Sequence, residues 1–116
     1  MLLRIDPGSA VPLFDQLAGS IRGAVLSGGV KAGERLPTAR DLAGSLDINV
    51  HTVFRAYQLL RDEGLVELRR GRGAIITDSA QRYSQLSAAI DTVVTEARNL
   101  GIGPETVNSL LRETFR

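Results

Sequence analysis

The stretch that decides the fold runs from Leu36 to Thr77 and reads LPTARDLAGSLDINVHTVFRAYQLLRDEGLVELRRGRGAIIT. Its apolar residues recur at helical spacing over two segments, which are separated by Asp47–Asn49, and then alternate over two shorter segments around an arginine- and glycine-rich turn. This order predicts a short helix, a tight turn, a longer helix and a β-hairpin. Such an arrangement is a helix-turn-helix followed by a wing.

Both helices of this stretch have recognisable starts. Thr38 is a good N-cap with Asp41 three residues on, close to a capping box, and Asn49 can cap the second helix with Thr52 at its third position. Gly64 is placed to end the second helix. The residues expected to face inward are Leu42, Ala43 and Leu46 on the first helix, and Val53, Ala56, Tyr57 and Leu60 on the second.

The hairpin is predicted from residues 65–68 and 74–77, which alternate on either side of Arg69–Gly73. Two glycines flanking one residue suit a tight turn. They place Arg70 and Arg72 at the tip of the wing.

The segment before this stretch is expected to support it. Residues 2–5 predict a short strand, closed by a turn at Asp6–Gly8, and Pro12 then opens a helix that stops at Gly28–Gly29. Residues 28–37 read as a loop whose Leu36 enters the core. The helical stripe expected to be buried comprises Leu13, Leu17, Ile21, Ala24 and Val25.

The pattern changes from about Ala80, where one amphipathic helix begins; Gly101–Gly103 ends it, and Pro104 starts another. Two helices of this size cannot bury both apolar stripes by themselves. The stripes can pack back on the winged domain or against the same helices of a second chain, and we favour the second interpretation, a homodimer. The expected dimerisation residues are Leu86, Ile90, Val93, Val94, Ala97, Leu100, Val107, Leu110, Leu111 and Phe115.

The predicted fold class is therefore mainly α with a small β-hairpin wing. Residues 1–78 form a winged helix-turn-helix DNA-binding domain in this prediction, and residues 79–116 form a two-helix dimerisation or effector region.

Composition narrows the function further. The chain has 116 residues, no cysteine and one histidine, which leaves no disulfide framework and no cluster of metal ligands, so neither a metal nor a cofactor is expected. No apolar run approaches the roughly 18 residues of a membrane span, and the N-terminus lacks a signal-peptide pattern. We therefore expect a cytoplasmic protein without membrane contact. The net charge is only +1, so local placement of arginines carries the argument for nucleic acid.

The longer helix has the length that fits the major groove of DNA, and its first turns face base edges. Asparagine, histidine and threonine there can hydrogen-bond bases or phosphates, while Val50 and Phe54 can offer apolar contact to a thymine methyl. Helix N-termini bring exposed N–H groups towards phosphates, and glycines in the wing let its backbone approach the sugar–phosphate chain or enter the minor groove. The candidate DNA-binding residues are Thr38, Arg40, Asn49, Val50, His51, Thr52, Arg55, Arg70, Arg72 and Gly73.

Four blocks in this order resemble the winged helix-turn-helix domain of GntR-family transcription regulators. They are LPTARDLA at 36–43, N-x-x-TV-x-x-AY-x-x-L at 49–60, EGLV at 63–66 and RGRG at 70–73. The resemblance covers about residues 11–77. The remaining tail is too short for the large effector domains of most subgroups, and its two helices resemble the YtrA subgroup, in which a small C-terminal part serves dimerisation and the regulator often sits in an operon with an ABC transporter.

The resemblance implies DNA contacts from Arg40, from the start of the second helix at 49–52, and from the wing at Arg70, Arg72 and Gly73. One departure matters for sequence recognition. Many members of the family have arginine where Val50 and Phe54 stand here.

The leading hypothesis is a homodimeric DNA-binding regulator, a repressor of an inverted-repeat operator, with double-stranded DNA as its partner. A small-molecule effector of unknown identity could bind between the domains or at the dimer interface. The alternative is a winged helix that binds protein rather than DNA. An enzyme is the weakest reading, because no nucleophile–base pair, metal cluster or phosphate loop is visible.

Overall fold

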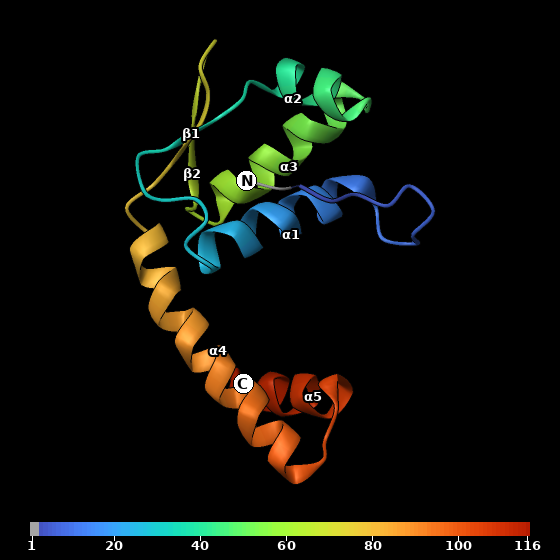
Figure 1. Cartoon of the computed structure of the whole chain (residues 1–116), viewed down its shortest axis with the longest axis vertical. Coiled ribbons are helices and arrows are strands. Elements are labelled where there is room, and N and C mark those ends of the chain that lie inside the picture. The colour runs from blue at the N-terminus through green and yellow to red at the C-terminus, as the bar shows by residue number, and fades with distance from the viewer. Residues whose placement is uncertain (1–2) are drawn as a thin grey trace. The chain divides into compact units, whose positions relative to one another are not determined.

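A computed structural model describes residues 3–116 of the chain. It divides into two compact units, the first running to Ser84 and the second from Gln85 to Arg116. The elements follow in the order α1 (Leu13–Leu26), β1 (Arg35–Leu36), α2 (Ala39–Leu46), α3 (Val50–Asp62), β2 (Val66–Arg69), β3 (Gly73–Ile76), α4 (Ala80–Leu100) and α5 (Pro104–Thr114) (Figure 1). The predicted fold class, a mainly helical chain with a wing, is confirmed.

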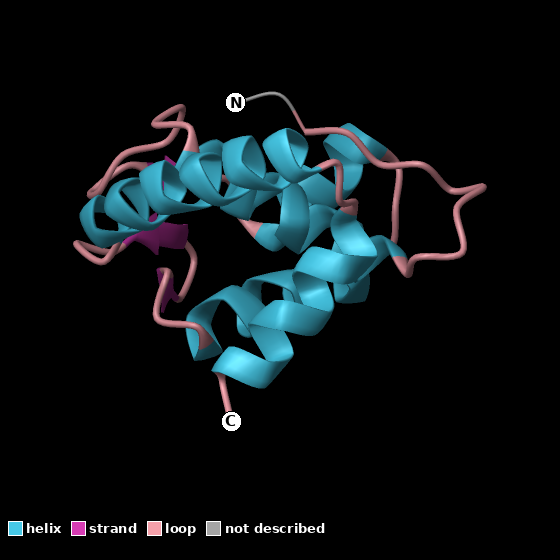
Figure 2. Ribbon diagram, turned by 90° about the horizontal axis from the view of Figure 1, so that it is seen from below, coloured by secondary structure: helices cyan, strands magenta, loops and turns pink. Residues whose placement is uncertain are grey.

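The first unit, which we call the winged unit, has a continuous apolar core. Figure 2 distinguishes its helices from its small sheet. Helices α1, α2 and α3, all three strands and the first residue of α4 contribute, because the elements turn apolar faces towards one another. The buried residues are Leu17, Ala18, Ile21, Val25, Val30, Leu36, Leu42, Ala43, Val53, Ala56, Tyr57, Leu60, Leu65, Val66, Ala74, Ile76 and Ala80.

The helix starts are capped as the sequence indicates. The backbone N–H of Asp41 donates to Thr38 Oγ1 over 3.1 Å, and that of His51 donates to Asn49 Oδ1 over 2.8 Å. Between the helices, Asp47 takes a left-handed conformation with φ of 56°, which aspartate tolerates better than most side chains. This residue makes the tight turn that sets α3 against α2.

The sheet contains one strand more than the predicted hairpin. Its order is β1-β3-β2, with both pairings antiparallel. Strand β1 places Arg35 opposite Ile75 and Leu36 opposite Ala74, within the segment predicted to be loop. A strand of two residues has no periodicity to detect, and it exists because β3 offers it an open edge. The hairpin strands are each displaced by one residue from the predicted bounds.

The predicted N-terminal strand is wrong where it can be checked. Leu2 lies outside the described residues, and residues 3–5 are not in a strand. Side chains of α1 hold this arm instead: Ser20 Oγ donates to the Arg4 carbonyl over 3.1 Å, and the Gln16 amide bonds both the N–H and the C=O of Asp6. The predicted turn follows, with the Ser9 N–H donating to the Asp6 carbonyl.

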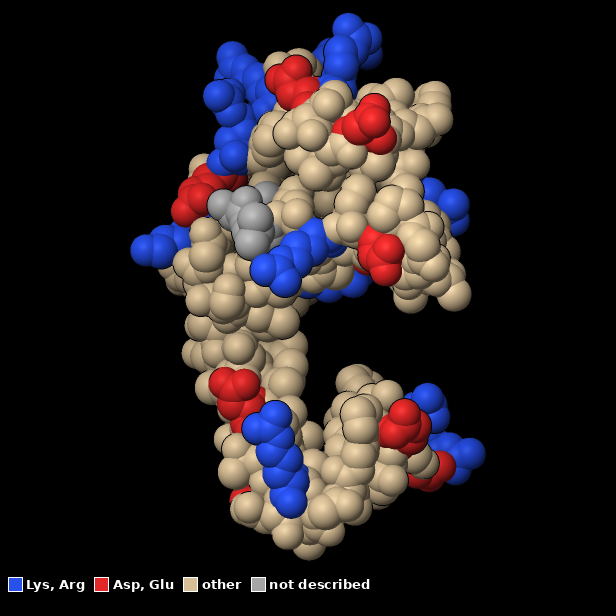
Figure 3. Space-filling view, turned by 45° about the vertical axis from the view of Figure 1, so that its right-hand side comes forward, with Lys and Arg blue, Asp and Glu red and all other residues tan. Residues whose placement is uncertain are grey.

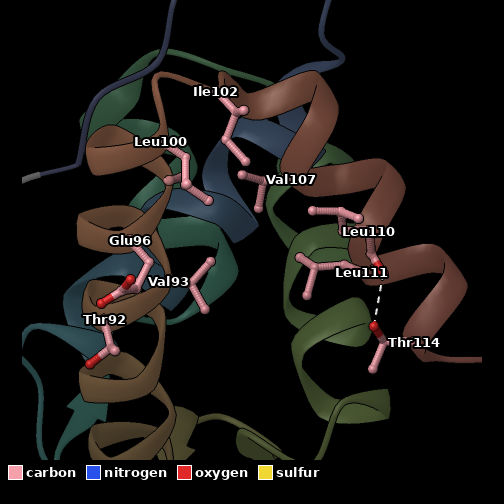
Figure 4. A pocket seen from close by; sticks show the side chains of 10 residues that line it. Thr92, Val93, Glu96, Leu100, Ile102, Val107, Leu110, Leu111 and Thr114 are labelled. Atoms are coloured by element: carbon pink, nitrogen blue, oxygen red, sulfur yellow. Dashed lines mark hydrogen bonds between the residues drawn. The ribbon is translucent and has the colours of Figure 1, made fainter.

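The second unit, which we call the helix pair, joins the remainder of α4 to α5 through a turn at Gly101, whose φ is 72°. Pro104 opens α5, as predicted. Ala97 is buried, whereas most other apolar side chains of the pair are exposed in the single chain, to 75% at Leu100 and 88% at Phe115. Two apolar recesses of about 320 and 470 Å³ lie between the helices, the first of them lined by Val93, Leu100, Ile102, Val107 and Leu111 among others (Figure 4).

Among the described residues, no helix is both long and apolar enough to cross a membrane.

Candidate nucleic-acid interface

Helix α3 is anchored by one face, which fixes what its other face presents. Val53, Ala56, Tyr57 and Leu60 are buried, as predicted, and therefore lock the rotation of the helix about its axis. The start of the helix consequently points outward. Of the predicted contact residues there, Asn49, Val50, His51 and Arg55 are exposed and Thr52 is half-buried.

Tyr57 connects this helix to the segment that precedes α2. Its hydroxyl donates to the Pro37 carbonyl over 2.7 Å. Burial raises the pKa of the Tyr57 phenol above its ordinary value, so the phenol remains a protonated donor at neutral pH. The bond therefore positions the start of α2, where Thr38 and the exposed Arg40 lie, relative to α3.

The wing tip is a three-residue loop, Arg70-Gly71-Arg72, between the paired residues Arg69 and Gly73. The Arg72 N–H donates to the Arg69 carbonyl over 3.0 Å, and Gly71 has a φ of 72°. Arg69 forms an ion pair with Glu67 at 3.0 Å, whereas no described residue forms an ion pair with Arg70 or Arg72. The tip thus carries two exposed cations that are available to a phosphate.

Arginine side chains gather, beside a few acidic ones, at the end of the winged unit that carries the wing tip and α2, at the top of Figure 3. The net charge of +1 conceals this local concentration. A surface of this kind attracts a polyanion without requiring a basic protein.

Both the backbone conformation and the packing at position 73 require glycine. Its φ is 78°, and a Cβ atom at this position would lie 2.7 Å from the Pro37 carbonyl oxygen and closer still to that of Leu36. The wing therefore meets the segment before α2 at a point where only glycine fits. The resemblance names Gly73 as a DNA contact, and its position in this structure gives it a separate structural role.

Arg55 points towards α1 rather than along the outward face of α3. Its guanidinium carbon lies 3.8 Å from the centroid of the Phe14 ring, a cation–π contact. The side chain remains exposed, so Phe14 orients the charge without removing it from water. Spacing alone does not indicate this partner, because Phe14 and Arg55 lie on different helices.

A second contact between α1 and α3 was also missed. Arg22 makes two hydrogen bonds to the Glu63 carboxylate, of 2.6 and 2.7 Å, and these bonds raise the pKa of the guanidinium. Glu63 belongs to the EGLV block, which gave no hint of its partner 41 residues earlier. The pair secures the end of α3 opposite to the outward-facing start.

Comparison with known protein families identifies the family of this chain. The family model described as "Bacterial regulatory proteins, gntR family" matches residues 13–76, which is more than half of the chain. The chain is a member of the GntR family. It is accordingly a DNA-binding transcription regulator and not an enzyme.

Relatives of this GntR-family regulator match nearly its whole length. It is 29% identical to the HTH-type transcriptional repressor YtrA of Bacillus subtilis, over 97% of this chain and 91% of the relative. An HTH-type transcriptional regulator of Mycobacterium tuberculosis is 40% identical over 86% of this chain and 83% of its own. The match thus extends beyond the winged unit into the helix pair.

Solved structures agree. YtrA from Sulfolobus acidocaldarius, a GntR-family transcription factor, superposes with a TM-score of 0.63 at 30% identity, over 82% of this chain and 99% of that one. A GntR-family regulator from Listeria monocytogenes gives a TM-score of 0.64 at 27% identity, over 94% and 98%. The resemblance to the YtrA subgroup, drawn from the short two-helix tail, is confirmed.

Proposed function

We propose that this GntR-family regulator is a homodimeric repressor that binds an inverted-repeat operator in the cytoplasm. DNA binding is supported by the outward-facing start of α3 and by the wing tip. No described residue forms an ion pair with the two arginines at that tip. The name of the Bacillus subtilis relative supports repression. The link to an ABC-transporter operon remains a prediction from the resemblance alone.

In this proposal the start of α3 enters the major groove, with Asn49, His51 and Thr52 hydrogen-bonding bases or phosphates. Arg70 and Arg72 reach the flanking minor groove or its phosphates. Thr38, Arg40 and Arg55 lie at the edges of this protein surface. Arg40 and Arg55 add positive charge there. The outward face is polar and cationic around a small apolar part, which favours DNA over the alternative of a protein-binding winged helix.

Dimerisation is assigned to the helix pair. Its exposed apolar side chains flank the recesses between α4 and α5, and leaving so many of them in water is unfavourable. A second copy can bury the same surfaces by two-fold symmetry. Such a dimer would present two α3 helices to half-sites about one helical turn apart, roughly 34 Å.

The test of DNA binding is a titration of the whole protein with the duplex upstream of its own gene and with random duplex, from low to high salt. Several phosphate contacts predict a steep fall of affinity with salt and a clear preference for the upstream DNA. Arg72→Ala should weaken binding by about 1–3 kcal/mol if it reads bases. Arg69→Ala is the matched control, since Glu67 already pairs that charge. A flat salt response without sequence preference would sink the proposal.

The test of dimerisation is sedimentation equilibrium of the free protein over a wide concentration range. The proposal predicts a dimer at micromolar concentration and binding of two chains per operator. A strictly monomeric protein that occupies single half-sites independently would contradict it.

A further inference from the structure

Two apolar side chains stand exposed on the outward face of α3. Val50, the first residue of the helix, is 40% exposed, and Phe54 is 46% exposed. Residues four apart lie on the same side of a helix with their Cβ atoms about 6 Å apart. Val50 and Phe54 therefore form one small apolar edge, and nothing in the core accounts for it.

The Phe54 ring also borders an open recess of about 290 Å³. Its other walls are Thr38 and Ala39 at the start of α2, and the hairpin from Leu68 to Gly71 together with Gly73. The wing thus approaches Phe54 without covering it. Space remains beside the ring for a small group delivered from outside.

The surroundings of this edge define the chemistry of its occupant. Arg70 lines the same recess, and Arg40 and Arg72 are exposed on the neighbouring elements. Two side chains are far too small a patch for a protein interface, which needs about 800 Å² from each partner. The occupant must instead carry small apolar groups inside a strongly anionic molecule. The C5-methyl group of a pyrimidine in the major groove of DNA meets both conditions.

Resting on the proposed function, we infer that Val50 and Phe54 read the C5-methyl groups of two pyrimidines in each half-site. Base pairs are spaced about 3.4 Å along the duplex, so two side chains about 6 Å apart reach positions one to two steps from each other. Thymine carries this methyl group, and so does 5-methylcytosine. Residues 50 and 54, where many members of the family have arginine, would thus recognise the operator through methyl contacts.

The experiment begins with selection of the preferred site from a pool of random, unmethylated duplexes, using the whole protein. Each thymine of the selected half-site is then replaced singly by deoxyuridine, which removes the methyl group and keeps every base-pairing atom. Removing one buried methyl should weaken binding about fourfold. We expect this loss at two positions one to two steps apart, and no comparable loss elsewhere.

Variants assign each methyl to its side chain. Phe54→Ala should abolish the deoxyuridine effect at one of the two positions and Val50→Ala at the other, while Phe54→Leu should retain it. Val11→Ala is the matched control, because Val11 is 50% exposed on the arm before α1 and should leave both effects intact. Circular dichroism melts verify that each variant is folded.

The outcomes separate the inference from the proposed function. A selected site with steep salt dependence, but without a deoxyuridine effect that the variants remove, overturns the inference and leaves the proposed function standing. Failure to select any site overturns both. Cytosine at the two positions, with affinity gained on 5-methylation, would support the methyl contact and identify 5-methylcytosine as its source.

Discussion

The winged unit and the helix pair contain similar apolar residues but place them differently. In the winged unit, leucine, isoleucine and valine side chains from three helices and three strands meet in one core. In the helix pair, Ala97 is buried, while Leu86, Leu110 and Phe115 are at least half exposed. The difference teaches that an amphipathic stripe identifies a surface to be covered, but not the molecule that covers it.

The first way to test this contrast is to remove a core side chain. Leu60 is fully buried, so Leu60→Ala should lower the free energy of unfolding by about 2–5 kcal/mol. Urea denaturation followed by circular dichroism measures the change. Leu110→Ala, on the exposed stripe, is the comparison at one fixed low protein concentration, where dimerisation contributes little. Equal losses from the two variants would refute the contrast.

A charge on the helix pair should act on association instead. Leu111→Asp should raise the dissociation constant of the dimer at least about tenfold, because burying an unpaired charge at an interface costs roughly 2–5 kcal/mol. Ser109→Asp, an exposed position on the same helix that does not line either recess, is the control. Sedimentation equilibrium measures both. If the two variants associate equally well, the stripe is not the dimer interface.

The wing offers a matched pair of glycines. Gly71 and Gly73 both have positive φ, but an added Cβ has open space at Gly71 and meets the Leu36 and Pro37 backbone at Gly73. Gly71→Ala should therefore lower the free energy of unfolding by about 1 kcal/mol, and Gly73→Ala by about 3 kcal/mol. Thermal melts rank the two. Equal effects would show that the close approach to Pro37 yields easily.

A similarly small effect is expected at neutral pH from Tyr57→Phe. Losing the hydrogen bond leaves the Pro37 carbonyl without this donor and should lower the free energy of unfolding by about 1 kcal/mol. Burial raises the pKa of Tyr57, so the folded state favours the neutral phenol. Its contribution is present below the unfolded pKa of about 10 and is lost as pH rises towards the higher folded value. Stability of the native protein should thus fall more steeply above pH 10 than that of the variant, and parallel pH curves would contradict this.

Local signals in the sequence were sufficient for most of the winged unit. The caps at Thr38 and Asn49, the glycine after α3 and the buried stripe from Val53 to Leu60 all depend on neighbours within one or two helical turns. Such signals are readable without knowing the fold. What they could not indicate were contacts between distant segments, such as Arg22 with Glu63, because nothing in either neighbourhood names its partner.

The same division applies to the candidate interface. The sequence alone determined that α3 would expose its start and that two arginines would stand at the wing tip, since both follow from periodicity and turn chemistry. Only the tertiary structure decided that β1 joins the sheet, that Gly73 must lack a side chain and that Arg55 rests on Phe14. These features depend on which surfaces meet after the chain has folded, and long-range packing of that kind leaves no mark on the spacing of residues.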